Sequence, residues 1–379
     1  MAETITTKCV HGQKNAENPF GAVSYPIFQT ATFAHPGVGQ STGYDYSRLQ
    51  NPTREHLEKV VASLENGIDA LAFSSGMAAV ATLMEIFKPG DHLIVEEDLY
   101  GGSVRFFGNI SEKNGISFTR LDIATASVEE AILENTKAIY IETPTNPMMH
   151  VADIEKLAQL AHKHGLLLIV DNTFLSPYLQ NPLDLGADIV VHSGTKYLSG
   201  HNDTLAGFLV TKSEELSEKF RFLIKTSGAM LAPFDSWLLL RGIQTLAVRM
   251  NAAQANAECI AKWLLTQKSV KKVYYPGLPE HPGHEIMEKQ ARGFGAMVTF
   301  EVESKEQAQS ILENIQLIQF AESLGSTETL LTYPITQTHA DVPPELLKKN
   351  GITDRLLRLS VGIESTEDLI EDLSQALAR

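Results

Sequence analysis

Cysteine is scarce in this sequence, with only Cys9 and Cys259 among 379 residues. Two thiols cannot build a disulfide framework, and this pair lacks the short spacing of zinc ligands. We therefore expect no metal site and a protein that works in a reducing compartment, the cytoplasm.

Long hydrophobic runs and an excess of basic charge are missing too. The longest apolar stretches, such as LLLIV at 166–170, have the length of a strand rather than of a membrane span, and the first 20 residues hold no signal-peptide core. The chain carries 46 acidic and 31 basic side chains, for a net charge of −15. Such a surface repels phosphate backbones and anionic lipid, so we expect neither nucleic acid nor a membrane as partner.

Between about residues 70 and 211, short apolar runs alternate with helical patterns. Several runs are apolar throughout, as is typical of strands covered on both faces. The pattern predicts an α/β domain with a mostly parallel sheet. Its strands are expected at ALAFSS, DHLIVEE, AIYIETP, LLLIVDN, DIVVHS and LAGFLVT, and a helix is expected over 151–165, ending on Gly165.

The two ends of the chain differ from this central part. A long helical pattern over 233–267 leads to AMVTFEV, KEQAQSILENI, LRLSVGIE and EDLIEDLSQAL, which predict a smaller α+β domain. Before residue 60 the chain is richer in Gly, Pro, Tyr and Asn and shows no clear helix or strand. We expect an extended arm over 1–60, an α/β domain over 61–245 and a C-terminal α+β domain over 246–379.

Polar residues follow several of the expected strands, where open parallel sheets bind their ligands. Asp171 follows LLLIV, and Ser193, Thr195 and Lys196 follow DIVVH. A third strand end carries small residues at an expected helix start, namely Ser74, Ser75, Gly76 and Met77.

Taken alone, a lysine in a polar loop is more often a solvated surface charge than a catalyst. A lysine can, however, form a Schiff base, and enzymes that use pyridoxal phosphate (PLP) pair that lysine with an acid on the pyridinium nitrogen. Lys196 and Asp171 are candidates for the two roles, although Asp171 by itself also suits a turn. The helix start at Gly76 could bind the phosphate of the cofactor or serve only tight packing. Tyr100 could stack on the pyridine ring of the cofactor or pack in the ordinary way.

Six motifs, read together, are more specific. The strings YSRLQNPTR, SSGMAA, ETPTNP, VDNTF, HSGTKYLSGH and LLRLSVGIE follow one another over essentially the whole chain. They closely resemble the Cys/Met-metabolism family of PLP-dependent enzymes, which includes cystathionine γ-synthase, the cystathionine lyases, O-acylhomoserine sulfhydrylases and methionine γ-lyase. The resemblance implies an aspartate-aminotransferase-like fold (fold type I), PLP as cofactor, and a homotetramer built as a dimer of dimers with shared active sites.

The resemblance also implies residues that hold the cofactor. Lys196 would form the Schiff base, Asp171 would pair with the pyridine nitrogen and Tyr100 would stack on the ring. The phosphate would be held by Gly76, Met77, Ser193 and Thr195, and from a neighbouring subunit by Tyr46 and Arg48.

By the same resemblance, five residues would bind an amino-acid substrate. Arg358 would hold the α-carboxylate, a role that suits a planar guanidinium, with Asn146 and Ser323 beside it. Arg105 would suit a distal carboxylate and Glu322 a distal amino group, as in cystathionine. A solvated loop acid is the ordinary alternative for Glu322.

Members of the family remove the substrate α-proton and expel a side-chain group, and the freed amine of Lys196 would carry protons between carbon atoms. Leu49 and Thr226 stand where enteric-type synthases carry an arginine and an asparagine, which makes a succinyl ester a less favoured substrate. Gly102 stands where methionine γ-lyases usually carry cysteine. The strings APFDSW and TYPITQTHADVP resemble the synthase and thiol-lyase branch of Gram-positive bacteria, whose usual donors are acetyl esters.

We therefore predict γ-replacement on an O-acylhomoserine by cysteine or sulfide. Cystathionine γ- or β-lyase activity is the close alternative, and methionine γ-lyase activity is a more distant one. A PLP aminotransferase and a noncatalytic PLP-binding or regulatory protein are disfavoured by the full set of motifs. No sequence feature determines the acyl group, the thiol or the balance between elimination and replacement.

Overall fold

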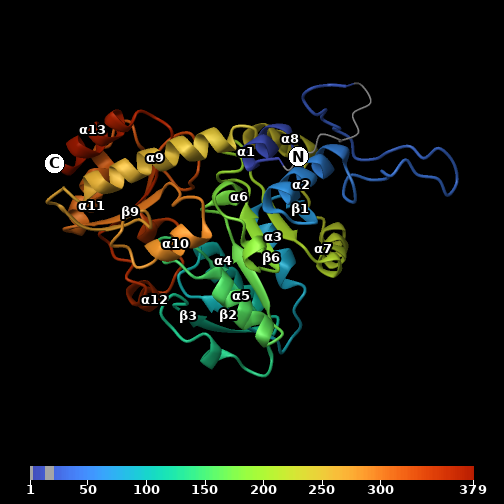
Figure 1. Ribbon diagram of the computed structural model, residues 1–379, viewed down its shortest axis with the longest axis horizontal. Coiled ribbons are helices and arrows are strands. Elements are labelled where there is room, and N and C mark those ends of the chain that lie inside the picture. Colours follow the sequence, from blue (N-terminus) through green and yellow to red (C-terminus); the bar gives the residue numbers. More distant parts are fainter. Residues whose placement is uncertain (1–2, 13–20) are drawn as a thin grey trace.

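The computed structural model describes residues 3–12 and 21–379 and contains two sheets with helices packed on them (Figure 1). The larger sheet has the strand order β1-β7-β6-β5-β4-β2-β3. Strand β7 runs antiparallel to its neighbours β1 and β6, and the other pairs are parallel, which confirms the expected mostly parallel sheet. The bounds are β1 Asp69–Phe73, β2 His92–Glu96, β3 Ser117–Leu121, β4 Thr136–Glu142, β5 Leu167–Asp171, β6 Ile189–Ser193 and β7 Gly207–Thr211.

Alternate residues of these strands enter two separate cores, because successive side chains of a strand point to opposite faces. In β5, Leu168 and Val170 join one core, whereas Ile169 joins the other. The first core is shared with α2 (Pro52–Glu65), α5 (Ile154–Lys163) and α8 (Pro233–Ile243), and the second with α3 (Gly76–Met84) and α7 (Glu214–Ser227). Short helices complete this part, namely α4 (Gly101–Phe106), a π-helical turn at Phe107–Ser111, α6 (Ser176–Leu179) and 3₁₀ turns at Glu129–Ala131 and Pro182–Leu185.

The C-terminal part is built on the second sheet, of order β10-β11-β12-β9-β8, in which β10 and β11 are parallel and the other pairs antiparallel. The long helix α9 (Leu246–Leu264) packs on it together with α11 (Lys305–Asn314) and α13 (Thr366–Leu377) (Figure 1). This arrangement confirms the smaller α+β domain, while the three residue boundaries stay a prediction. The remaining bounds are β8 Val270–Tyr274, α10 His284–Gln290, β9 Met297–Val302, β10 Gln319–Phe320, β11 Leu330–Thr332, a 3₁₀ turn Pro334–Thr336, α12 Pro344–Lys349 and β12 Leu356–Ser360.

Several elements differ from the sequence prediction. Strand β3 was not expected, since its residues SFTRL are only partly buried at the sheet edge and mix polar with apolar side chains. The pattern over 233–267 forms two helices rather than one, with a break at Gln244 and Thr245. At this break, Arg249 Nη2 donates a hydrogen bond to the carbonyl oxygen of Gly242 at 2.8 Å.

Helices also occur within the region expected to be an extended arm. Helix α1 spans Ile5–His11, and α2 begins at Pro52, where the Asn51 side chain accepts hydrogen bonds from the next two free backbone N–H groups. The sequence Asn-Pro-Thr was therefore an N-cap signal that the prediction did not use. The described residues 21–51 contain neither helix nor strand and extend away from both sheets (Figure 1).

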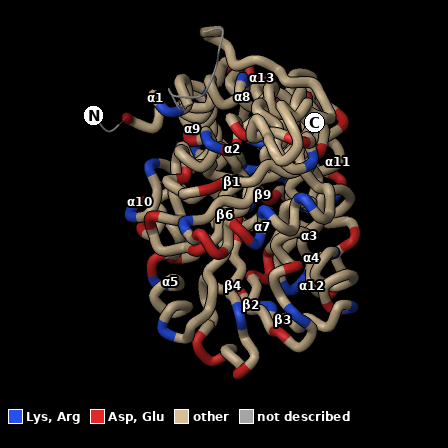
Figure 2. Tube along the Cα trace, turned by 90° about the vertical axis from the view of Figure 1, so that its right-hand side faces the viewer, with Lys and Arg blue, Asp and Glu red and all other residues tan. Residues whose placement is uncertain are grey.

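Charged residues of both signs occur in both sheet-bearing parts of the fold. Figure 2 shows Lys and Arg positions interspersed with Asp and Glu positions over both parts of the molecule. Among the residues that the structure describes, no helix has the length and apolar character needed to cross a membrane.

Replacing Ile169 tests the contribution of the larger sheet's core to stability. Ile169 is fully buried in β5, so Ile169→Ala should lower the free energy of unfolding by about 2–5 kcal/mol through lost contacts and a cavity. The matched variant Ile169→Val removes one methylene group and should cost only about 0.5–1.5 kcal/mol. Urea denaturation of the purified proteins measures both, and equal costs for the two variants would contradict this packing.

Candidate active site

A cavity of about 210 Å³ lies at the carboxyl ends of β4, β5 and β6, where the loop 322–324 and Arg358 of the C-terminal part close it. This is the edge at which parallel sheets bind ligands. The cavity brings together most of the predicted site residues, namely Gly76, Met77, Tyr100, Asn146, Asp171, Ser193, Thr195, Lys196, Glu322, Ser323 and Arg358.

Lys196 reaches the cavity from the loop that follows β6. Its Nζ donates a hydrogen bond to Ser323 Oγ at 2.9 Å, so the two parts of the chain meet at the amine. Burial, together with the nearby charge of Arg358, lowers the pKa of Lys196 to about 8, and Glu322 opposes the change. A substantial share of the amine is thus neutral near pH 8, which is the nucleophilic form.

Two carboxyl groups lie side by side at the ends of neighbouring strands. Glu142 ends β4 and Asp171 ends β5, and the two residues are partners in the parallel register. Asp171 Oδ1 accepts a hydrogen bond from Thr173 N at 3.0 Å, and Glu142 Oε2 accepts one from Tyr100 N at 2.9 Å. Burial raises the pKa of both groups, and the charge of Asp171 raises that of Glu142 further. A cationic ring nitrogen beside them would offset this cost.

Glu142 was not predicted as a site residue. The run AIYIETP was expected to be a strand, and its acid Glu142 ends β4, so it follows the same rule of strand ends as Asp171. A polar residue that ends a buried parallel strand was the available signal.

The start of α3 forms a second wall of the cavity. Ser75 caps the helix by accepting a hydrogen bond from Ala78 N at 3.0 Å, and a Cβ atom on Gly76 would lie only 3.1 Å from Ser193 Cβ. A glycine therefore allows the helix start and β6 to approach each other. The free N–H groups of this first turn, with the hydroxyls of Ser193 and Thr195 on the same cavity, suit an anion such as phosphate.

Tyr100 borders the cavity with its ring beside Met77 and Gly102. A Cβ atom at Gly102 would lie 2.4 Å from Tyr100 Cε1 and 3.1 Å from Met77 Sδ. The absence of a side chain at residue 102 therefore leaves room for the aromatic ring in this position.

Arg358 is a buried guanidinium on β12. Its Nη1 donates to Asn146 Oδ1 at 2.7 Å and its Nη2 to the carbonyl oxygen of Ser323 at 2.9 Å, whereas its Nε has no hydrogen-bond partner among the described residues. Burial lowers the pKa of Arg358 to about 10, so the group stays charged at neutral pH. A buried cation with a free N–H group suits the carboxylate of a substrate.

Three predicted residues lie outside the cavity. Arg105 is exposed near the end of α4 and forms an ion pair with Asp341. Tyr46 and Arg48 lie on the arm, where Arg48 Nη1 donates to the carbonyl oxygen of Lys225 at 2.5 Å and the guanidinium lies 5.5 Å from the centre of the Tyr46 ring. In the described part of the chain, no group of three or more His, Cys, Asp or Glu residues is arranged to hold a metal ion.

Residues 6–378 match the family model described as Cys/Met metabolism PLP-dependent enzyme. This chain is a member of that family. It is 50% identical to cystathionine γ-lyase of Bacillus subtilis, over 98% of both chains. It is 48% identical to the cystathionine γ-synthase/O-acetylhomoserine (thiol)-lyase of the same organism, over 100% of this chain and 98% of the relative. Among solved structures, cystathionine γ-lyase from Lactobacillus plantarum complexed with L-serine matches with a TM-score of 0.97 and 46% identity, over 99% of each chain.

The family membership makes this protein a PLP-dependent enzyme of transsulfuration that forms or breaks carbon–sulfur bonds. The cavity fits the cofactor at three points. The amine of Lys196 suits the aldehyde, the glycine start of α3 suits the phosphate, and the buried pair of Asp171 and Glu142 suits the ring nitrogen.

The pKa of Lys196 gives a testable pH dependence. Because burial lowers that pKa to about 8, the neutral amine should predominate above pH 8 and the ammonium form below it. Reductive methylation of the cofactor-free protein, followed by peptide mass spectrometry, should show the labelling rate of Lys196 rising with a midpoint near pH 8. A midpoint close to the ordinary lysine value of 10.5 would contradict the burial of this amine.

Proposed function

We propose that this protein catalyses γ-replacement on an O-acylhomoserine, with cysteine or sulfide as the incoming thiol. The Cγ–O bond breaks, the carboxylate of the acyl group leaves, and the thiol sulfur forms the new Cγ–S bond as it releases its proton. The observation that carries the proposal is the single cavity that holds the Lys196 amine, the acid pair and the Arg358 guanidinium.

The side chains of the cavity divide this work between them. PLP, when bound, withdraws the electrons that the substrate α-carbon gains when its proton leaves. The Lys196 amine takes up that proton, and its hydrogen bond to Ser323 keeps Nζ directed into the cavity. Arg358 and Asn146 orient the substrate α-carboxylate, and Tyr100 covers one face of the site.

Two residues support an acetyl ester as the preferred donor. Leu49 and Thr226 stand where enteric-type synthases carry an arginine and an asparagine. This chain therefore lacks, at these two positions, the guanidinium and the amide that would suit a succinyl group. The likeness to the Bacillus subtilis cystathionine γ-synthase/O-acetylhomoserine (thiol)-lyase points the same way.

Cleavage of cystathionine is the second candidate. The Bacillus subtilis cystathionine γ-lyase, at 50% identity, favours it, and so does Glu322, an exposed carboxylate that borders the cavity and suits a distal ammonium group. Arg105 remains the proposed partner of a distal carboxylate. Since Arg105 and Asp341 are both exposed, a side-chain movement would suffice to exchange one carboxylate for the other.

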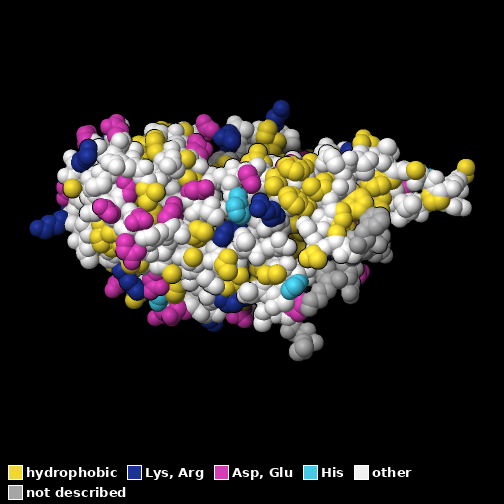
Figure 3. Space-filling model, turned by 90° about the horizontal axis from the view of Figure 1, so that it is seen from above, with side chains coloured by type: hydrophobic (Ala, Val, Ile, Leu, Met, Phe, Trp, Pro, Cys, Tyr) yellow, Lys and Arg dark blue, Asp and Glu magenta, His cyan; other side chains and the backbone are white. Residues whose placement is uncertain are grey.

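A homotetramer with shared active sites is also part of the proposal. Tyr46 and Arg48 lie outside the cavity of their own chain, which suits donation to a neighbour. Large apolar side chains are exposed on the arm and on α8, including Val23, Val38 and Phe234, and Figure 3 shows hydrophobic side chains gathered over this side of the molecule. Contact between copies of the chain would cover them.

Product analysis separates the two candidate reactions. The enzyme should convert O-acetylhomoserine and cysteine to cystathionine faster than it converts O-succinylhomoserine, and faster than it releases 2-oxobutyrate from cystathionine. Lys196→Ala should abolish all three conversions and serves as the control for nonenzymatic reaction. If the enzyme cleaves cystathionine much faster than it condenses any acylhomoserine, the lyase is the correct assignment.

A further inference from the structure

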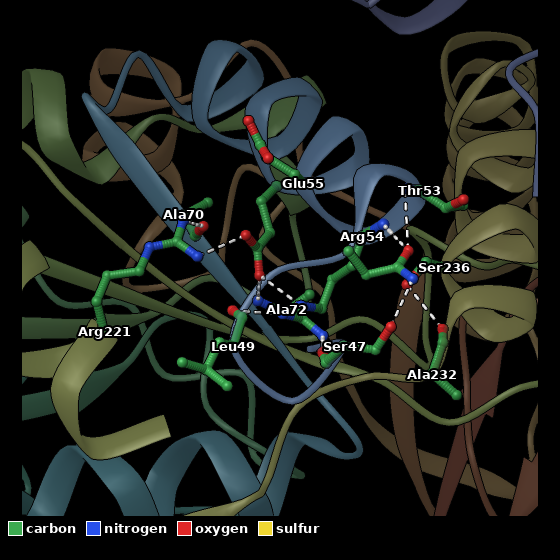
Figure 4. A network of polar contacts seen from close by, with 12 residues as sticks. Ser47, Leu49, Thr53, Arg54, Glu55, Ala70, Ala72, Arg221, Ala232 and Ser236 are labelled. Carbon is green, nitrogen blue, oxygen red and sulfur yellow. Dashed lines mark hydrogen bonds and ion pairs between the residues drawn. The ribbon is translucent and has the colours of Figure 1, made fainter. Parts of the chain in front are cut away.

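Arg54, in the first turn of α2, lies beneath the arm that carries Tyr46 and Arg48. Its Nη1 donates to the carbonyl oxygen of Ser47 at 2.6 Å and its Nη2 to that of Leu49 at 2.9 Å (Figure 4). These two carbonyls belong to the residues on either side of Arg48. One guanidinium therefore holds the backbone on both sides of that residue.

The Arg54 guanidinium is itself held by a buried carboxylate, that of Glu58. Arg54 is 3% exposed, and its Nε lies 3.4 Å from Oε1 of Glu58, which is 2% exposed. Glu58 also accepts hydrogen bonds from Ala72 N of β1 at 3.0 Å and from Arg221 Nη1 of α7 at 2.6 Å. Because Arg54 is buried, turning away from Glu58 would separate its charge from this carboxylate, which costs free energy inside the protein.

The arm contrasts with this buried support. Asn51 Nδ2 donates to Ser47 Oγ at 3.0 Å and to the carbonyl oxygen of Phe28 at 2.9 Å, so the backbone is held from the helix start as well. The side chains of Tyr46 and Arg48 nevertheless remain exposed and lie against each other. A phenol and a guanidinium on a fixed backbone can both donate to an anion, Arg48 with the N–H groups that its bond to the Lys225 carbonyl does not use.

From these contacts we infer that Arg54, locked by Glu58, is a positioning residue for the cofactor of the neighbouring subunit. It fixes the segment 46–49 so that Tyr46 and Arg48 meet the phosphate group there. This inference rests on the proposed donation of these two residues between subunits. Arg54 itself touches neither cofactor nor substrate.

Cofactor binding to the apoprotein tests the inference without measuring turnover. Arg48→Ala and Arg54→Lys should each weaken PLP binding by about tenfold or more, since the contacts at stake are charge-assisted. Neither should change the affinity for pyridoxal, which lacks the phosphate, by more than about threefold. The effect of Arg54→Lys on PLP affinity should be smaller in the Arg48→Ala background than in the wild type, because Arg54 acts through Arg48 and Tyr46. Lys59→Ala, an exposed change on the same helix, is the matched control and should leave both affinities unchanged.

A purely structural role predicts a different result. If Arg54 only stabilises α2, Arg54→Lys should weaken PLP and pyridoxal alike, and its effect should add to that of Arg48→Ala. Glu58→Gln keeps the shape of the side chain and should reproduce the selective loss of PLP affinity, so the inference can be tested even if Arg54→Lys folds poorly. Loss of both ligands in either variant that still folds, or no loss of PLP affinity in both, would overturn it.

Mixed oligomers then show which subunit Arg54 serves. Chains with Arg54→Lys, unfolded and reassembled in equal amounts with Lys196→Ala chains, should regain about a quarter of wild-type activity, because half of the dimers are mixed and each has one intact site. The same experiment with Arg48→Ala is the reference. If neither mixture recovers, the proposed sharing of sites is wrong. If only the Arg48→Ala mixture recovers, sharing stands and the positioning role of Arg54 is wrong.

Discussion

The site depends on one buried guanidinium. Arg358 comes from the smaller sheet, yet it binds Asn146 of the larger part and the carbonyl oxygen of Ser323, whose hydroxyl accepts the hydrogen bond of Lys196. Burying a cation without an ion pair is costly unless hydrogen bonds satisfy it, and here the partners are neutral groups from both parts of the chain. The guanidinium thus joins the two parts and stays available to a carboxylate.

The same electrostatics explain why one lysine is reactive. Lys196 lies near Arg358 and away from bulk water, and both factors favour its neutral form over the ammonium. The acids across the cavity experience the reverse, since burial favours the neutral form of both and the charge of Asp171 adds to this effect on Glu142. Each charge is costly in this cavity until a ligand of opposite charge arrives, so binding energy and reactivity have a common origin.

Much of this could be predicted from the sequence, for identifiable reasons. The runs LLLIV and IVV are apolar throughout because both faces of the sheet are covered, and the rule that ligands bind at strand ends then selects Asp171 and Lys196. The edge strand β3 was not predicted, because its partly exposed residues do not form an apolar run. The ion pair of Arg105 with Asp341 joins segments that only the tertiary fold brings together. Tyr46 and Arg48 were identified from the family resemblance, and their role between subunits stays a proposal.

The central claim is that the amine of Lys196 holds the cofactor in this cavity. Reduction of the holoenzyme with borohydride makes that bond permanent, and peptide mapping then locates the pyridoxyl group. The account predicts a single labelled peptide, carrying the group on Lys196 between Thr195 and Tyr197. A pyridoxyl group on any other lysine, with Lys196 unmodified, would contradict it.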